Sequence, residues 1–269
     1  MKTCSILVLF ACALAAALLA GCSGNSPGAF QGYIEGEYVY VAAPLGGALT
    51  NLAVARGDSV KTGQLLFELE RGSEAAALDI AKRNLTQAKT GLALSEAEFA
   101  RREKLHADQG VVSTEELDQA RAQRDVDAAL VESQQGALDK AKWSFDQKQQ
   151  FAPTNAFVQD TLYRQGEWVT AGNPVVVLLP PANLKVRFFA PEMLLAQIKI
   201  GQGVGVSFDG AAKNYFATVN YISTQNEFTP PVIYNRENRA KLVYMIEAKF
   251  SPADAVELRP GQPVDVQVP

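Results

Sequence analysis

Two copies of one motif lie 109 residues apart in the chain, and no gap interrupts the match. The matched pairs are Pro44 and Pro153, Gly57 and Gly166, Asp58 and Glu167, Val60 and Val169, Gly63 and Gly172, and Leu69 and Leu178. An internal repeat indicates two segments with the same local structure, and such segments gain stability by packing on each other. The fold is therefore expected to contain two equivalent halves.

Each copy is predicted to be a series of short strands joined by glycine turns. Apolar residues alternate through Leu52 and Val54 in the first copy, a period typical of half-buried strands. Gly57 and its counterpart supply turns, because glycine tolerates positive φ. Since neither copy can bury both faces of its strands, residues 33–71 and 151–181 are predicted to form one small β-sandwich.

Residues 72–150 separate the two halves and have the composition of long helices. The stretch 73–150 contains no Pro and three Gly. The first arm has a seven-residue seam at Leu78, Leu85, Leu92 and Phe99, with companions Ala81, Ala88 and Ser95. The second arm has Leu117, Val131, Leu138 and Phe145, interrupted by Arg124, with companions Ala120, Gln134 and Ala141. This spacing predicts two helices packed as a coiled coil.

A turn is predicted between the two arms. Gly110 ends the first helix, and Ser113 with Glu116 has the spacing of a capping box that begins the second. Each arm of about 33 residues would then be on the order of 50 Å long. The alternative is a helical domain folded back on itself, which the absence of Pro disfavours.

The N-terminus has the features of a secretory signal at residues 1–21. Lys2 is followed by the apolar run 6–19, which is too short to span a membrane. The sequence Leu-Ala-Gly-Cys ending at Cys22 resembles the bacterial lipobox, which implies cleavage before Cys22 and lipid attachment to it. An ordinary signal with an incidental Cys is the alternative. A flexible linker is predicted at 22–32.

Composition argues against catalysis and against nucleic-acid binding. His106 is the single His of the chain, so no metal cluster of several His can form, and any Ser-His-Asp set would have to use this residue. The other two cysteines lie in the removed signal, so no internal disulfide can form. A formal net charge of −4 disfavours a nucleic-acid partner. We predict a protein that is not an enzyme.

The pattern Gly-Asp/Glu-x-Val-x-x-Gly-x-x-Leu in both halves resembles the biotinyl/lipoyl domain. In carrier proteins of that fold, a modified Lys lies at the tip of a hairpin between the halves. The helical excursion replaces that hairpin here, so no lipoyl or biotin cofactor is expected, and the N-terminal lipid is the one modification expected.

A lipobox, a split lipoyl-like pair and an inserted helical hairpin together resemble the HlyD-like periplasmic adaptors, also called membrane fusion proteins. The resemblance implies an elongated, multi-module α+β protein. Its parts are a split lipoyl-like β-sandwich with an inserted antiparallel α-helical coiled-coil hairpin at 72–150, followed by an antiparallel β-barrel at 182–269. Strands of that barrel are expected at 184–192, 201–210, 217–222, 242–250 and 264–268.

The resemblance also implies a site at the hairpin tip. Adaptors of this family contact a TolC-type outer-membrane channel through an Arg, a Leu four residues later and a Ser seven after that. Arg101 and Leu105 have the first spacing, but Ser113 follows Leu105 by eight residues. Starting from Arg102 keeps the Ser spacing and puts His106 in the Leu position. A plain solvated turn is the alternative to a docking tip.

The partners implied by the resemblance are those of a tripartite efflux or secretion system. They are an inner-membrane transporter, a TolC-type outer-membrane channel, and further copies of the chain, with a hexamer expected. Residues 228–235 resemble a loop of adaptors paired with ABC exporters, which favours the ABC class over the RND and MFS classes. The predicted location is the periplasm, with the lipid in a cell membrane, the inner membrane favoured.

Two other functions remain open at this point. The chain could be a structural or ligand-binding envelope lipoprotein that uses its hairpin for assembly without transport. A lipoyl-type carrier is the third candidate, which the missing Lys hairpin disfavours.

Overall fold

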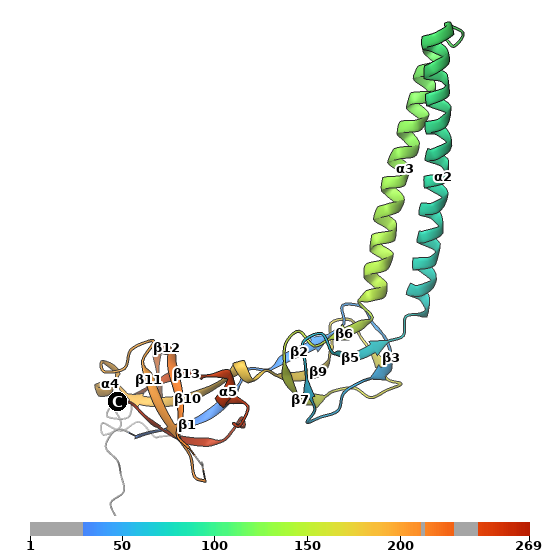
Figure 1. The fold of residues 1–269 in the computed structure, drawn as a ribbon. Coiled ribbons are helices and arrows are strands. Elements are labelled where there is room, and N and C mark those ends of the chain that lie inside the picture. The colour runs from blue at the N-terminus through green and yellow to red at the C-terminus, as the bar shows by residue number, and fades with distance from the viewer. Residues whose placement is uncertain (1–28, 211–212, 229–241) are drawn as a thin grey trace, which may run out of the picture. The chain divides into compact units, whose positions relative to one another are not determined.

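The computed structural model describes residues 29–210, 213–228 and 242–269, and its contacts divide the chain into two compact units. The platform unit is Tyr38–Pro180, and the barrel unit combines the chain up to Glu37 with Pro181–Pro269. Figure 1 shows the elements of each unit. The predicted signal peptide at 1–21, the lipid site Cys22 and most of the segment 228–235 lie outside the described residues. Within those ranges, no helix has the combined length and hydrophobicity of a membrane span.

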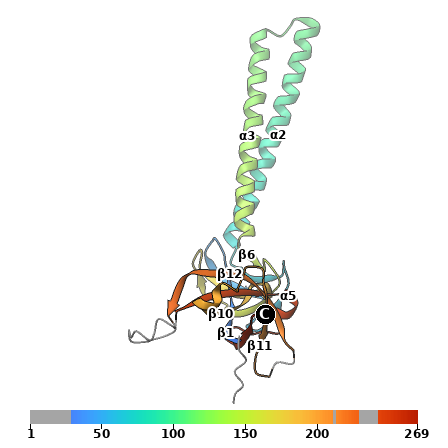
Figure 2. The same ribbon diagram turned by 90° about the vertical axis from the view of Figure 1, so that its left-hand side faces the viewer.

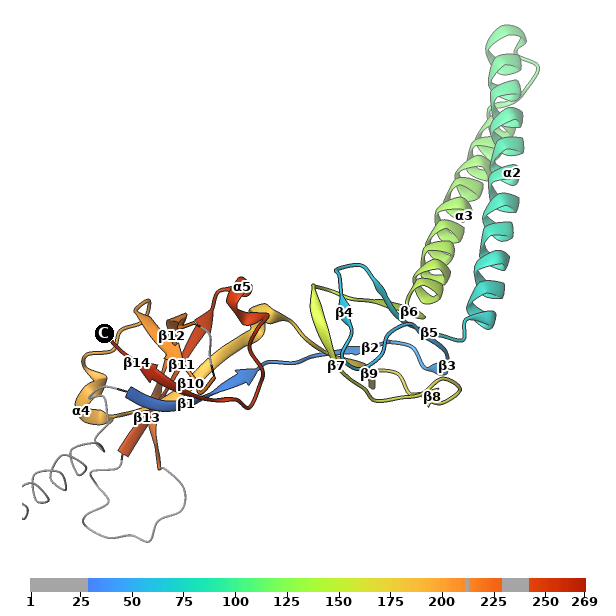
Figure 3. The same cartoon turned by 60° about the horizontal axis from the view of Figure 1, so that its bottom comes forward.

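The platform unit contains two four-stranded sheets, and each sheet takes strands from both halves of the repeat (Figure 3). The first sheet has the order β2 (Val39–Ala42), β9 (Pro174–Leu179), β7 (Ala156–Thr161) and β4 (Ser59–Val60). The second has the order β6 (Gln149–Phe151), β5 (Leu65–Leu69), β3 (Gly47–Leu52) and β8 (Trp168–Val169). One hydrophobic core between them includes Leu49, Phe67, Val158, Val169 and Leu178. The predicted sandwich of two halves is confirmed.

The two halves exchange equivalent hydrogen bonds. The Gly57 N–H donates to the Val158 carbonyl at 2.8 Å, and the Gly166 N–H donates to the Leu49 carbonyl at 2.8 Å. Both glycines have left-handed backbone, with φ of 96° and 93°, a conformation that costs other residues energy. The repeat therefore encodes one turn used twice, and each turn binds the opposite half.

Helices α2 (Gly72–Gln109) and α3 (Thr114–Asp146) form an antiparallel hairpin, drawn as the green arms in Figures 1 and 2. They are continuous over 38 and 33 residues, which excludes the folded-back helical domain. The buried positions of the seam are Ala81, Leu85, Ala88, Ser95 and Ala120, all of them predicted. Small residues dominate the seam, so the hairpin stays narrow.

Lys148 fixes the root of the hairpin to the platform. Its side chain is buried, donates to the Gly46 carbonyl at 2.6 Å, and pairs with Glu74 in the first turn of α2 at 3.0 Å. Burial acts to raise the pKa of Glu74, but hydrogen bonds from Lys148 and Ser73 outweigh it and hold that pKa below its usual value. Arg71 lies over the Phe145 ring at 4.5 Å and joins the same root. Both helices are thus anchored where they leave the sheets.

The barrel unit is a closed barrel of six strands. Their order is β1 (Ala29–Gly36), β10 (Leu184–Pro191), β13 (Leu242–Phe250), β12 (Tyr215–Phe228), β11 (Gly203–Ser207) and β14 (Pro263–Gln267). The short helices η1 (Pro181–Asn183), α4 (Glu192–Leu195) and α5 (Pro252–Ala255) lie between strands. The predicted antiparallel barrel is confirmed.

Strand β1 corrects two of the predicted boundaries. Residues 22–32 were assigned to a linker and 33–71 to the first half of the sandwich, yet β1 lies in the barrel and pairs with both β10 and β14. Phe30 and Ile34 point into the barrel core. Without β1 the barrel would have two open edges, so the N-terminal strand closes it.

A ladder of charged side chains ties β1, β10 and β13 together. Lys185 pairs with Glu247 at 2.8 Å and with Glu37 at 2.6 Å, while Arg187 pairs with Glu35 at 2.7 Å and with Glu247 at 2.9 Å. Burial acts to raise the pKa of Glu247, but the hydrogen bonds from Lys185 and Arg187 outweigh it and lower that pKa. Glu247 is thus the carboxylate shared by both cations.

We expect Glu247→Gln to destabilise the barrel in a pH-dependent way. At pH 7 it leaves two largely buried cations without their shared carboxylate, so the free energy of unfolding should fall by about 2–3 kcal/mol. Because the pKa of Glu247 is lower in the folded protein, its ionised carboxylate stabilises the fold at pH values above the unfolded pKa near 4.5. This stabilisation is lost as the pH falls through the folded-state pKa. The difference between the two proteins should therefore narrow at pH 3.

Hydrogen-exchange protection of β10 and β13 amides at the two pH values measures this difference. Glu192→Gln, a change at an exposed carboxylate, is the matched control and should leave protection unchanged. If Glu247→Gln lowered the protection of these amides equally at pH 7 and pH 3, the charge of this side chain would contribute nothing to stability.

Candidate docking site at the hairpin tip

The tip is a short turn whose two ends are capped by their own residues. Gly110 has φ of 59° and its N–H donates to the His106 carbonyl at 3.3 Å, which ends α2. The Ser113 side chain accepts from the Glu116 N–H at 3.2 Å, and Glu116 accepts from the Ser113 N–H at 2.9 Å. The predicted stop and capping box are confirmed, so the turn is well defined without a partner.

Arg102 links the two helices at the tip. Its Nε donates to Glu98 Oε1 at 2.8 Å on α2, and its Nη1 donates to the Glu116 carbonyl at 3.3 Å on α3. The side chain is 35% exposed, against 67% for Arg101. The guanidinium of Arg102 is thus engaged within the hairpin.

His106 also serves the turn itself. Its Nδ1 lies 2.7 Å from the Val112 carbonyl, which fixes the chain just before Ser113. The register Arg102, His106 and Ser113, which keeps the expected Ser spacing, therefore consists of three residues that hold the tip together.

The outward surface of the tip comes from other residues. Arg101 pairs with Glu98 Oε2 at 3.1 Å, and most of its side chain is exposed to solvent. Val111 is 70% exposed at the apex of the turn, and Leu105 is half-buried. The structure thus exposes the cations Arg101 and Lys104 and the apolar side chain of Val111 near the tip.

Hydrogen bonds keep both tip carboxylates ionised. The Arg102 bond, and then the charges of Arg101 and Arg102, lower the pKa of Glu98. The Ser113 N–H and hydroxyl lower the pKa of Glu116. The capping and cross-helix contacts therefore persist throughout the neutral range.

Arg124, which interrupts the predicted seam, has a defined partner. Its guanidinium lies 4.6 Å from the Phe99 ring centroid, and that of Arg121 lies 5.6 Å from the same ring. A cation over an aromatic face is attractive, so the interruption is a cross-helix contact. Sequence reasoning missed this pair and missed exposed Val111; an apolar residue directly after a helix-ending glycine was the available signal.

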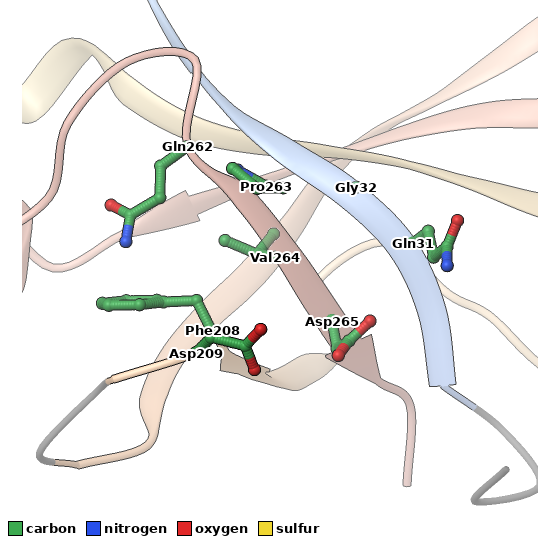
Figure 4. A pocket seen from close by; sticks show the side chains of 8 residues that line it. All are labelled: Gln31, Gly32, Phe208, Asp209, Gln262, Pro263, Val264 and Asp265. Atoms are coloured by element: carbon green, nitrogen blue, oxygen red, sulfur yellow. The ribbon is translucent and has the colours of Figure 1, made fainter.

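A hollow of about 470 Å³ lies on the barrel, beside β1 and β14 (Figure 4). Phe208, Asp209 and Asp265 are among its lining residues. It contains no His, Cys, Ser or Lys to act as a base or nucleophile. Throughout the described ranges, no three His, Cys, Asp or Glu side chains gather as metal ligands. The lining of this hollow thus supplies two carboxylates, Asp209 and Asp265, with no His, Cys, Ser or Lys beside them, and we take the tip as the candidate site.

Comparison with known proteins gives a consistent result. Residues 77–148 match the family described as "RND MFP, alpha-helical hairpin domain". The chain is 28% identical to the UPF0194 membrane protein of the asrC 5′ region of Acidithiobacillus ferridurans, over 88% of this chain and 86% of that one. It is 26% identical to the UPF0194 membrane protein YbhG of Salmonella gallinarum, over 88% and 87%.

Two solved structures share the architecture. The membrane fusion protein Spr0693 of Streptococcus pneumoniae aligns with a TM-score of 0.67 at 20% identity, over 90% of this chain and 98% of that one. MacA of Actinobacillus actinomycetemcomitans aligns with a TM-score of 0.68 at 18% identity, over 91% and 81%. The hairpin domain and the fold of this chain are thus similar to those of membrane fusion proteins.

We expect the two arginines of the tip to respond differently to truncation. Arg102→Ala removes a hydrogen bond between the helices worth about 1 kcal/mol, so amides 110–117 should exchange about fivefold faster. Arg101→Ala removes a solvent-exposed pair and should leave that exchange unchanged. Hydrogen exchange followed by mass spectrometry reads both variants. Equal exchange in the two would contradict the assignment of Arg102 as the residue that positions the tip.

Proposed function

We propose that this protein is a periplasmic adaptor of a tripartite efflux or secretion system, and that it is not an enzyme. It bridges an inner-membrane transporter and a TolC-type outer-membrane channel, and the cargo passes along the assembly chemically unchanged. The proposal assigns the hairpin tip to the channel, with Arg101, Leu105 and Val111 as contact residues. Arg102 and Ser113 act as positioning residues that shape the turn.

The single observation that supports this function most strongly is the hairpin with its preformed tip. Helix α2 is uninterrupted over 38 residues and extends about 55 Å. Lys148 pairs with Glu74 in its first turn, Gly110 ends it, and Ser113 caps the start of α3. A turn that satisfies its own hydrogen bonds loses little conformational freedom when a partner binds. The exposed side chains of Arg101 and Val111 are then available to contact that partner.

The proposal includes a lipid anchor. Signal cleavage would leave Cys22 as the acylated first residue, and several acyl chains on one residue give stable attachment. Anchoring in the inner membrane would raise the concentration of the barrel beside a transporter. If this anchor holds the chain, Cys22→Ser should release the chain from membranes.

The partners are proposed at the level of class. We infer a homo-oligomer, with six copies as the expected number, because a single hairpin cannot enclose a path for cargo. We retain the ABC class of transporter on the resemblance of residues 228–235, although the family matched by the hairpin carries an RND description. Copurification of a transporter ATPase with the tagged chain would support the ABC class, and copurification of an RND pump would reject it.

Site-directed crosslinking in cells tests the docking of the tip. The mature chain keeps no thiol except Cys22, whose sulfur would carry lipid, so an introduced Cys is the single reactive thiol. Val111→Cys should form an adduct with the outer-membrane channel in the presence of a bifunctional maleimide crosslinker that also reaches an amine. Ser113→Cys is a poorer probe, because loss of the N-cap costs about 1 kcal/mol.

Ile80→Cys is the matched control, since it is an exposed apolar residue near the other end of α2. It should give no channel adduct. Val111→Cys without an adduct, in cells where the pump still exports, would reject docking at this tip. The charge reversal Arg101→Glu should lower both the adduct yield and export, while leaving the thermal stability of the purified chain unchanged.

An envelope lipoprotein without a transport role is the second candidate, favoured only by the low identity to the proteins it resembles. Deletion separates the two functions. Intracellular accumulation of a transported dye should rise in the deletion strain of an adaptor and stay constant in that of a structural lipoprotein.

A further inference from the structure

One end of the barrel collects several features that the proposed adaptor role does not use. Strand β1 begins there at Ala29, which pairs with Gln267 at the end of β14. The β1–β10 register runs from Gly36↔Leu184 to Gly32↔Phe188, so the start of β1 lies toward Pro191 and the α4 helix that follows it. Figure 3 shows the start of β1, α4 and the C-terminus at this end. We name it the terminal end of the barrel.

Two strongly exposed apolar side chains lie at the terminal end. Met193 in α4 is 89% exposed, and Ile200 is 70% exposed. Ile200 precedes β11, whose Gly205 pairs with Gln267, and the neighbouring Gly201 N–H donates to the Val219 carbonyl at 2.8 Å. Segment 192–202 is therefore held at this end by backbone hydrogen bonds, with both side chains left in water.

The proposed anchor lies close by along the chain. Six residues, 23–28, lie between Cys22 and Ala29, and a fully extended chain covers at most about 25 Å over these seven steps. If Cys22 carries lipid, the terminal end cannot lie farther than this from the membrane surface. The opposite end, which carries Gly36 and Leu184, lies one strand length from Ala29 along β1.

We propose that the terminal end of the barrel rests on the lipid surface and inserts Met193 and Ile200 into the interfacial region. This inference depends on the lipid anchor proposed above, and it assigns a second, direct membrane contact to the folded barrel. Burying a Met or Ile side chain contributes about 1.5–3 kcal/mol, which is too little to hold a free protein on a membrane. A tether supplies the high local concentration that makes so small a patch effective.

Charge does not select the lipid here. Exposed Lys199 and exposed Glu192 lie in the same segment and offset each other. The contact is therefore apolar, and a zwitterionic bilayer suffices to test it.

The experiment uses the full lipidated chain with a single added Cys, labelled with an environment-sensitive fluorophore. The labelled variants are Met193→Cys, Ile200→Cys and, as the matched control, Val256→Cys, an exposed apolar residue that follows α5 at the opposite end. Each is reconstituted in phosphatidylcholine vesicles with and without lipids that carry a quencher in the acyl chain. Quenching at residues 193 and 200 should exceed that at residue 256 by at least about twofold.

A second measurement, the rate at which the chain passes between vesicles, tests how much the two side chains strengthen membrane binding. The double variant Met193→Ser/Ile200→Ser should pass between vesicles roughly tenfold faster than the unchanged chain, because it loses part of the apolar burial. Val256→Ser should pass at the unchanged rate.

The outcomes separate this inference from the proposed function. Equal, weak quenching at all three positions, on a chain that floats with the vesicles, would overturn the barrel contact and leave the anchor intact; it would also point to a membrane protein as the occupant of this end. A chain whose Cys22 carries no lipid by mass spectrometry and which fails to float would overturn the anchor and the barrel contact together.

Discussion

The reciprocal hydrogen bonds between the two repeat halves are the constraint on which the platform unit depends. Gly57 binds the Val158 carbonyl and Gly166 binds the Leu49 carbonyl, so each turn needs the other half to satisfy its amide. The same pairing brings the two ends of the helical excursion together, because the Leu69 N–H donates to the Lys148 carbonyl at 2.8 Å. Closure of the sheets thus forces residues 72–146 to leave and return at one place, and two antiparallel helices are the simple structure that does so.

Polar contacts at the root fix how the two helices leave the sheets, and small residues in the seam let the helices pack closely. Lys148 holds the first turn of α2 through Glu74, and Arg71 covers Phe145. Beyond the root, Ala81, Ala88 and Ala120 permit close approach of the helices but bury little area, so packing alone gives modest stability per turn. Contacts such as Arg124 on Phe99 supplement it. The root contacts thus fix where the two helices begin and end, and contacts between the helices stabilise the rest of the hairpin.

Local patterns predicted most of this structure, and long-range pairing accounts for what they missed. The repeat, the heptads and the capping box at Ser113 each act within a few residues or at one fixed offset, so the sequence alone could identify them. Strand β1 was misassigned because its partners, β10 and β14, follow it by some 150 to 240 residues, and its own alternation fits either unit. The choice between Arg101 and Arg102 likewise needed the position of the Glu116 carbonyl on the second helix.

At the tip, the residues that set the shape of the turn differ from the residues that are exposed on its surface. Arg102, His106 and Ser113 each direct their polar atoms to the hairpin's own backbone or capping partner, and these bonds set the geometry of the turn. Arg101, in the last part of α2, and Val111, in the turn, are exposed instead. Substitution of the first group should change the shape of the turn, whereas substitution of the second should change only its outer surface. If the tip docks as proposed, the one-residue displacement between Leu105 and Ser113 is tolerable, because α2 sets the positions of Arg101 and Leu105 and the cap of α3 sets that of Ser113.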